Sequence, residues 1–369
     1  MNKGFIPPPY PYERLDKFKS FGQLHEGGLV DLSIGTPCDP PAPAVVAALS
    51  SSNSERGYPP SIGTDELGNA AQAWIQRKFE ISINTSQIAA CIGSKEFVAT
   101  TPQWLKLRSP DRDTVLYPAV SYPTYEMGAV LAGCRAVPVS MTPNGGLETS
   151  SISPADAKRA LMLWSNSPSN PTGALDNLSA IAAWGRANTV PVFSDECYVE
   201  FTWDRSPESI LQHGLDGVVA LHSLSKRSNL AGVRVGFYAG DSELVNYLKE
   251  VRKHVGMLVP GPAQAAAAVA LGDDQHVVVQ RDRYKHRLER LANVLAKWSG
   301  YNIEMPAGGF YLWFDAQDGW TFTEQLAREG GALVSPGDFY GAGYANNVRV
   351  AVVQPDENIE LIAKRLDVK

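Results

Sequence analysis

Short apolar runs alternate along this chain with amphipathic stretches. The apolar runs predict strands, because a strand that is covered on both faces is apolar at nearly every position. They lie at residues 87–92, 114–117, 136–139, 160–163, 190–194, 218–221 and 233–239. Helices are predicted at residues 41–50, 65–78, 96–107, 125–132 and 178–187. Strands that alternate with helices predict an α/β fold, in which helices cover both faces of a mainly parallel sheet.

The two ends of the chain follow a different pattern. The first ~40 residues are rich in proline, glycine and tyrosine and predict an extended arm. Residues 276–298 predict a long helix that leads out of the large domain, and residues 309–314 and 348–353 predict strands of a smaller α/β domain. We therefore expect two domains. The large one covers residues 40–272, and the small one combines residues 1–39 with residues 273–369.

Composition narrows the class of protein. Hydrophobic residues make up 44% and charged residues 20%, as in ordinary globular enzymes. A net charge of -6 without a lysine-rich run argues against nucleic acid as a partner. Apolar stretches stay well below the ~18 residues of a membrane span. The four cysteines are scattered, so neither a disulfide framework nor a metal site is expected, and we expect a cytoplasmic protein.

Lys226 stands out among the polar residues. It lies in a hydroxyl-rich turn between two apolar runs, a setting that can lower the pKa of a lysine so that it forms a Schiff base with an aldehyde. Ser223, Ser225 and Arg234 surround it in sequence and could hold an anion. Together they suggest pyridoxal 5'-phosphate (PLP). An ordinary loop between two strands is the alternative for this segment.

Four further polar residues could bind a ligand. Ser94 and Lys95 open a helix after a strand, which suits a phosphate, although a plain turn with a capping serine has the same pattern. Asp195 ends an apolar strand and would need a partner such as a protonated pyridine nitrogen, unless it lies on the surface. Arg349 interrupts an apolar strand and could grip a carboxylate or form an internal salt bridge.

The segment around Lys226 resembles the cofactor-lysine segment of the class I/II aminotransferases of PLP fold type I. The family pattern is Ser-x-x-Lys followed by Arg and Gly, and Ser223, Lys226, Arg234 and Gly236 match it. More motifs match in family order: Gly35, Tyr58, Gly93-Ser94-Lys95, Tyr122, Asn170-Pro-Thr-Gly173, Asp195-x-x-Tyr198 and Arg349. The resemblance implies an aspartate-aminotransferase-like fold, with a mainly parallel seven-stranded sheet between helices plus a smaller α/β domain.

The resemblance also implies a role for each matching residue. Lys226 would carry PLP, Asp195 would face the ring nitrogen, and Tyr122 would stack on the ring. Asn170 and Tyr198 would contact the phenolic oxygen. The phosphate would be held by Ser94, Lys95, Ser223, Ser225, Arg234 and, across a homodimer interface, Tyr58. The substrate would meet Gly35, Asn170 and Arg349, the last through its α-carboxylate.

Among such enzymes the chain looks most like the succinyldiaminopimelate aminotransferases of actinobacteria. The resembling stretches include Trp164-Ser-Asn-Ser-Pro-Ser-Asn-Pro-Thr-Gly and His222-Ser-Leu-Ser-Lys-Arg-Ser-Asn-Leu-Ala-Gly. This implies amino transfer from glutamate, giving 2-oxoglutarate, to N-succinyl-2-amino-6-oxopimelate in lysine and diaminopimelate biosynthesis. Alternatives are a class I aminotransferase for another oxo acid and a PLP-dependent C–S β-lyase. A PLP-sensing regulator is disfavoured by the negative charge.

The acceptor's distal carboxylate and succinyl group need cationic or amide donors beyond Arg349. The candidates in sequence are Arg227, Arg252, Lys253 and His254. Residues 252–254 are equally typical of a solvated helix turn.

Overall fold

The structure, a computed structural model, describes residues 4–51, 53–54 and 56–369. Its contacts divide the chain into two compact units. The larger unit contains residues 36–286 and 306–310, and the smaller unit contains residues up to 35, 287–305 and 311–369. The predicted domain boundaries, at 39/40 and 272/273, stay a prediction. Among the described residues, no helix is long and apolar enough to cross a membrane.

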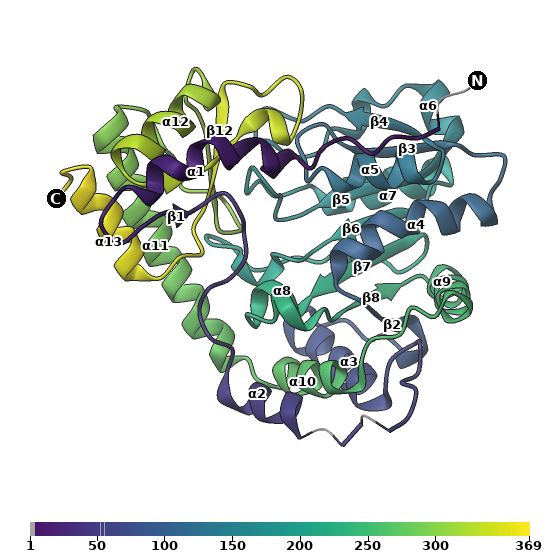
Figure 1. Ribbon diagram of the computed structural model, residues 1–369. Helices are drawn as coiled ribbons and strands as arrows, with labels where there is room; N and C mark the ends of the chain where they lie inside the picture. Colours follow the sequence, from purple (N-terminus) through teal and green to yellow (C-terminus); the bar gives the residue numbers. More distant parts are fainter. Residues whose placement is uncertain (1–3, 52, 55) are drawn as a thin grey trace. The chain divides into compact units, whose positions relative to one another are not determined.

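A seven-stranded sheet forms the centre of the larger unit (Figure 1). The strand order is β2 (Ile88–Cys91), β8 (Gly236–Gly240), β7 (Val218–Ser223), β6 (Val192–Asp195), β5 (Ala160–Asn166), β3 (Thr114–Pro118) and β4 (Arg135–Val139). β8 pairs antiparallel with both of its neighbours, and the pairs from β7 to β4 are parallel. The mainly parallel sheet predicted from the apolar runs is thus present.

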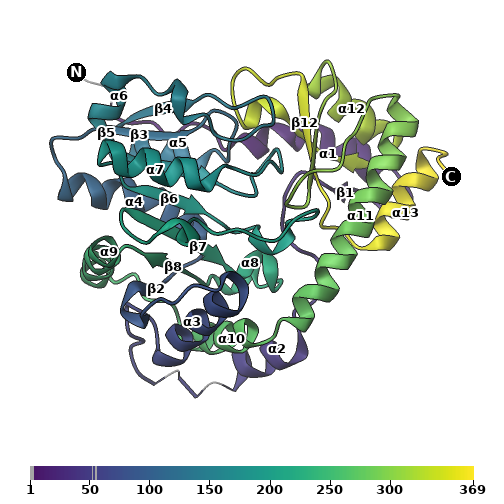
Figure 2. The same cartoon turned by 180° about the vertical axis from the view of Figure 1, so that it is seen from behind.

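Helices cover both faces of this sheet, as Figures 1 and 2 show from opposite sides. One face packs on α4 (Ser94–Arg108), α5 (Thr124–Leu131) and α9 (Ser242–Val255). The other packs on α3 (Asp65–Phe79), α7 (Leu178–Asn188) and α10 (Gly261–Gly272). The unit also contains α2 (Pro43–Ser50), α6 (Pro154–Arg159) and α8 (Leu224–Arg227). Each face therefore has its own apolar core.

The smaller unit contains two short sheets. Parallel strands β1 (Val30–Asp31) and β10 (Ala332–Leu333) form one, and antiparallel strands β11 (Ser335–Pro336), β12 (Asn347–Ala351) and β9 (Tyr311–Asp315) form the other. Its helices are α1 (Asp16–Gln23), α12 (Gly319–Glu329) and α13 (Asp356–Arg365). The long helix α11 (Gln275–Ser299) belongs to both units, since the division falls at residue 286.

Three local predictions need correction. The first ~40 residues are not simply an extended arm, because α1 forms at Asp16–Gln23 and buries Phe18. The strand predicted from residue 233 begins only at Gly236, because Arg234 has a left-handed backbone (φ 58°) that ends a short 3-10 turn. Lys226 lies in the short helix α8 and not in an open loop.

Candidate active site

Polar residues end three neighbouring strands of the large sheet. Asn166 is the last residue of β5, Asp195 of β6 and Ser223 of β7. Asn166 lies beside Asp195 in the β5–β6 register. Because β5, β6 and β7 are parallel, these side chains meet at one edge of the sheet, where α/β proteins bind ligands.

Two turns at this edge are bridged by Arg234. Its guanidinium nitrogen Nη1 lies 3.5 Å from Ser225 Oγ, and Nη2 lies 3.4 Å from the Ile92 carbonyl oxygen. Gly93 (φ 72°) directs the chain from β2 into α4, and a Cβ atom there would lie 2.1 Å from Arg234 Nη2. Ser94 begins α4, while Ser223 Oγ accepts a hydrogen bond from the Ser225 N–H at 3.2 Å. These turns offer hydroxyl, N–H and guanidinium donors that suit a phosphate.

Asp195 is a buried carboxylate, only 7% exposed, so it is not a surface aspartate. It accepts hydrogen bonds from Tyr125 Oη at 2.9 Å and from the Cys197 N–H at 3.2 Å. Burial raises the pKa of Asp195 above its ordinary value, while hydrogen bonds from Cys197 and Tyr125 and the charge of Lys226 act to lower it. A cation facing this carboxylate would favour its ionised form further.

The loop after β5 is tied to the same place. Asn166 Nδ2 donates to the Asp195 carbonyl oxygen at 2.8 Å, and Asn166 Oδ1 accepts from the Asn170 N–H at 2.8 Å. Asn170 is buried. The predicted site residues Asn170 and Asp195 are thus brought together through Asn166, which the sequence did not single out.

An aromatic ring lies near each of the two lysines of the predicted site. Lys226 Nζ lies 5.9 Å from the ring centre of Phe310, and the Tyr198 ring lies 5.3 Å from the same ring. Lys95 Nζ lies 5.8 Å from the Tyr122 ring centre. Phe310 and Tyr125 are contacts that the sequence reasoning missed, since the local pattern around each indicates only a packed aromatic.

Other predicted site residues lie elsewhere in the chain. Arg349 and Gly35 belong to the smaller unit. Arg349 is buried on β12, donates to the Ser33 carbonyl oxygen and lies 4.3 Å and 4.7 Å from the ring centres of Tyr311 and Tyr340. Tyr58, in the larger unit, is 98% exposed on a loop.

Two of the candidate contacts for the acceptor's distal groups are engaged inside the protein. Arg252 is buried and forms two hydrogen bonds of 2.7 Å with the carboxylate of Glu96. Arg227 is buried and pairs with Glu200 at 3.2 Å. Both guanidinium groups are thus paired inside the larger unit, and their role as contacts for the distal groups stays a prediction. Lys253 and His254 are exposed, as expected for a helix turn.

Comparison with known proteins adds to this geometry. Residues 28–366 match the family "Aminotransferase class I and II". Over 368 residues the chain is 39% identical to the 4-dedimethylamino-4-oxo-anhydrotetracycline transaminase OxyQ of Streptomyces rimosus, which covers 97% of this chain and 99% of that protein. It is 33% identical to an LL-diaminopimelate aminotransferase of Aquifex aeolicus, over 97% and 96% of the two chains.

The fold is likewise similar to solved structures. One is the "probable N-succinyldiaminopimelate aminotransferase" of Thermus thermophilus, with a TM-score of 0.85, 28% identity, and coverage of 96% of this chain and 98% of that one. The family match covers nearly the whole chain, and the strand-end residues fit it. The chain therefore belongs to the class I and II aminotransferases, a PLP-dependent family with the aspartate-aminotransferase-like fold.

Proposed function

We propose that this aminotransferase moves an amino group from glutamate to N-succinyl-2-amino-6-oxopimelate, a step of lysine and diaminopimelate biosynthesis. Support comes from a relative that is an LL-diaminopimelate aminotransferase. It also comes from a solved structure of similar fold whose name includes N-succinyldiaminopimelate. The observation that carries the reaction class is the meeting of Asp195, Ser225 and Arg234 at one sheet edge, in the same unit as Lys226. The site is proposed to work in the cytoplasm, consistent with four free cysteines.

The residues at this edge fit PLP. The Arg234 bridge and the Gly93 cradle gather donors from two turns for the phosphate, with Ser94, Lys95, Ser223 and Ser225 beside them. Asp195 supplies a buried carboxylate for the ring nitrogen. When bound, PLP supplies an aldehyde for covalent attachment and a ring that withdraws electrons from the substrate's Cα.

Lys226 has the central role in this proposal. Its Nζ would hold the cofactor and, once displaced by the amino donor, would move a proton to and from the substrate's Cα. Asp195 keeps the ring nitrogen protonated through an ion pair. Tyr198 and Asn170 would bind the phenolic oxygen, while Tyr122 would stack on the ring.

Substrate binding is proposed for Arg349 and Gly35, which both belong to the smaller unit. Gly35 is the residue after which the chain continues into the larger unit. Arg349 lies among tyrosine rings, and its planar fork can meet the α-carboxylate with two parallel bonds. A Cβ atom at Gly35 would lie 2.1 Å from Tyr311 Oη, so only glycine leaves room for this ring. Asn170 completes the proposed substrate contacts from the larger unit.

A second candidate function is favoured by one observation. The 39% identity to the OxyQ transaminase matches the chain to an enzyme whose name specifies a tetracycline intermediate. A class I aminotransferase for another oxo compound therefore remains the alternative, as does a C–S β-lyase of the same fold.

A panel assay distinguishes these functions. PLP-loaded protein is incubated with glutamate and each of several oxo compounds, including N-succinyl-2-amino-6-oxopimelate and simple 2-oxo acids, and 2-oxoglutarate formation is measured. The proposal expects the highest kcat/KM with the succinylated acceptor. A higher value with another acceptor assigns the alternative specificity, and pyruvate release from cystathionine assigns the β-lyase.

A further inference from the structure

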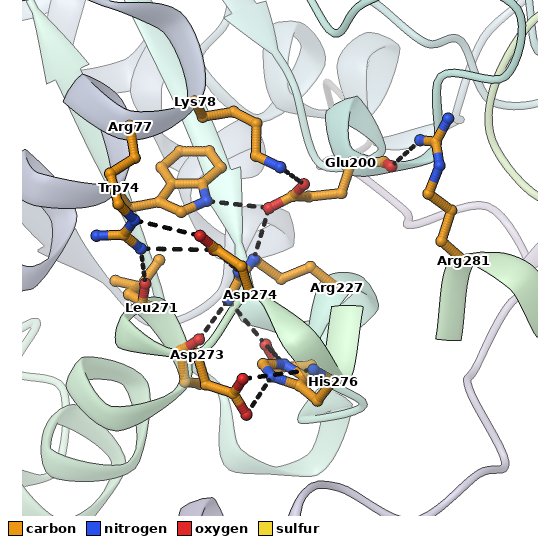
Figure 3. A network of polar contacts seen from close by, with 12 residues as sticks. Trp74, Arg77, Lys78, Glu200, Arg227, Leu271, Asp273, Asp274, His276 and Arg281 are labelled. Carbon is orange, nitrogen blue, oxygen red and sulfur yellow. Dashed lines mark hydrogen bonds and ion pairs between the residues drawn. The ribbon is translucent and has the colours of Figure 1, made fainter. Parts of the chain in front are cut away.

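A buried ion pair joins two turns of the proposed active site. Glu200 lies in the 3-10 turn η4 (Val199–Phe201), and this turn begins directly after Tyr198. Arg227 follows Lys226 in α8. Glu200 Oε1 and Arg227 Nε lie 3.2 Å apart, and both side chains are at most 5% exposed. Figure 3 shows the pair at the centre of a larger polar network.

Glu200 is fully engaged in this network. Its Oε1 also accepts a hydrogen bond from Trp74 Nε1 at 2.9 Å, and its Oε2 pairs with Lys78 Nζ at 2.7 Å. Its backbone carbonyl accepts from Arg281 Nη1 at 2.5 Å. Burial alone acts to raise the pKa of Glu200, but the charges of Arg227 and Lys78 outweigh it, so the pKa is lowered and the group is ionised.

Arg227 is held as firmly from the other side. Its Nη1 donates to the Ala270 carbonyl oxygen at 2.8 Å and to Ser228 Oγ at 3.1 Å, and its Nη2 lies 3.7 Å from Asp274 Oδ1 (Figure 3). Successive residues of a helix point about 100° apart. Fixing the side chain of Arg227 in the core therefore fixes the direction in which its neighbour Lys226 leaves α8.

We propose that Glu200 and Arg227 are positioning residues, which hold Lys226 at a fixed angle to the turn of Asp195 and Tyr198 and set the charge around its Nζ. This inference rests on the proposed function, in which Lys226 carries PLP. The two turns follow the paired parallel strands β6 and β7, so the ion pair joins them where they leave the sheet.

The charge balance around the pair gives the inference a signed consequence. The other charged or titratable groups that face it include Lys78 of α3, the buried His222 of β7, Asp274, and His276 and Arg281 of α11. On its own side, Lys226 faces Asp195 and Cys197. Removing the charge of Glu200 leaves more positive charge near Lys226, which would disfavour the protonated form of the bond between Lys226 Nζ and PLP. Removing the charge of Arg227 would favour that protonated form.

The test compares Glu200→Gln and Arg227→Met in PLP-loaded protein. The pH at which the cofactor's absorbance band changes should fall in Glu200→Gln and rise in Arg227→Met, each by on the order of one pH unit or less. In both, kcat of the glutamate half-reaction should fall at least ~10-fold with little change in KM, because Lys226 is misdirected. PLP uptake and the Tm of the cofactor-free protein are measured alongside.

Asp356→Asn is the control, because it removes the charge of the carboxylate that lies 2.6 Å from another buried arginine, Arg287, in the smaller unit. It should lower Tm without moving the absorbance transition. Shifts of the same sign in both test variants, or none, with unchanged kcat would show that the pair only stabilises the fold and would overturn the inference.

Two further readings keep the outcome clear. If Arg227→Met does not fold, Arg227→Lys retains the charge but not the fork, and it should keep the transition pH and lose kcat. Wild-type kcat in Arg227→Lys would overturn the inference. Borohydride reduction of the wild type separates the two levels: without an adduct on Lys226 the proposed function fails, whereas with the adduct but without opposite shifts only this inference fails.

Discussion

At the scale of single residues, the site depends on buried charges that need partners. Asp195 receives two hydrogen bonds inside the larger unit, and Arg349 lies among tyrosine rings inside the smaller one. A buried charge is costly without a partner, so such residues are strong candidates for ligand binding. We make a separate prediction for each of these two residues.

Asp195→Asn should still bind PLP, because the phosphate donors are unchanged, yet lose most of its turnover. The amide keeps the shape but no longer holds the ring nitrogen protonated. We expect kcat to fall by at least ~100-fold, measured beside PLP affinity by absorbance titration. Turnover close to that of the wild type would mean that Asp195 only supports the structure.

Arg349→Lys should weaken glutamate and the acceptor together, by roughly 2–5 kcal/mol if the contact is desolvated, because lysine lacks the planar fork. The measurement is kcat/KM for each substrate, with PLP binding unchanged. The control is Arg290→Lys, which alters an exposed two-bond pair with Glu360 in the same unit and should have no effect. Loss of the acceptor alone would make Arg349 a distal-carboxylate contact.

Part of the site follows from sequence and part does not. Asp195 and Ser223 could be predicted because a polar residue at the end of an apolar run is a local signal. Tyr125, Asn166 and Glu200 could not, because their contacts join residues that are 29 to 126 positions apart in the chain or depend on strand register. The internal pairing of Arg227 was missed for the same reason.

At the scale of elements, the turn from β2 into α4 depends on Gly93. Its positive φ of 72° is a conformation that residues with a Cβ rarely adopt, and Arg234 occupies the space that a Cβ would need. This glycine therefore allows the guanidinium to lie against the start of α4. Its conformation and its close neighbour can be tested separately.

Gly93→Ala should weaken PLP binding and lower Tm, because it adds a clash with Arg234 to the backbone strain. Gly133→Ala is the control: its φ is 66° and nothing lies within 4 Å of the added Cβ, so it carries the strain alone, on the order of 1 kcal/mol. PLP titration and thermal unfolding compare the two. Equal PLP affinity in both variants would mean that the close approach of Arg234 does not matter for the phosphate site.

Most elements of the sheet could be predicted, because a buried parallel strand has a continuous apolar signal. β3, β5 and β7 begin at the predicted residues, and each extends beyond its predicted end. The strand that begins at Gly236 was predicted to begin too early, at residue 233. Val233 and Val235 are apolar, but the segment turns at Arg234. Helix α1 was not predicted, because its segment is rich in proline and glycine. Leu15 and Phe18 are buried there by tertiary packing, which the local pattern does not reveal.

At the scale of the whole molecule, the predicted fold, cofactor and reaction class are confirmed by the family match over residues 28–366. The homodimer and the succinylated acceptor stay proposals. In a homodimer, Tyr58 of one chain would contribute to the active site of the other. It is 98% exposed in a single chain.

Mixing two impaired variants tests this shared site. Lys226→Ala and Tyr58→Phe chains are each expected to be impaired, and co-refolded mixtures should regain part of the activity. The reason is that one hybrid site combines an intact Lys226 with an intact Tyr58 of the other chain. Fully active monomers in sedimentation experiments, or no recovery in a mixture shown to contain heterodimers, would contradict the proposal.

The most direct test of the whole account is the position of the covalent cofactor. PLP-loaded protein is reduced with borohydride and digested, and its peptides are examined by mass spectrometry, with Lys226→Ala as the control. The account predicts one adduct, on Lys226, its loss in the control, and a fall in turnover of several orders of magnitude there. An adduct on another lysine, such as Lys95, or full activity of Lys226→Ala would contradict it.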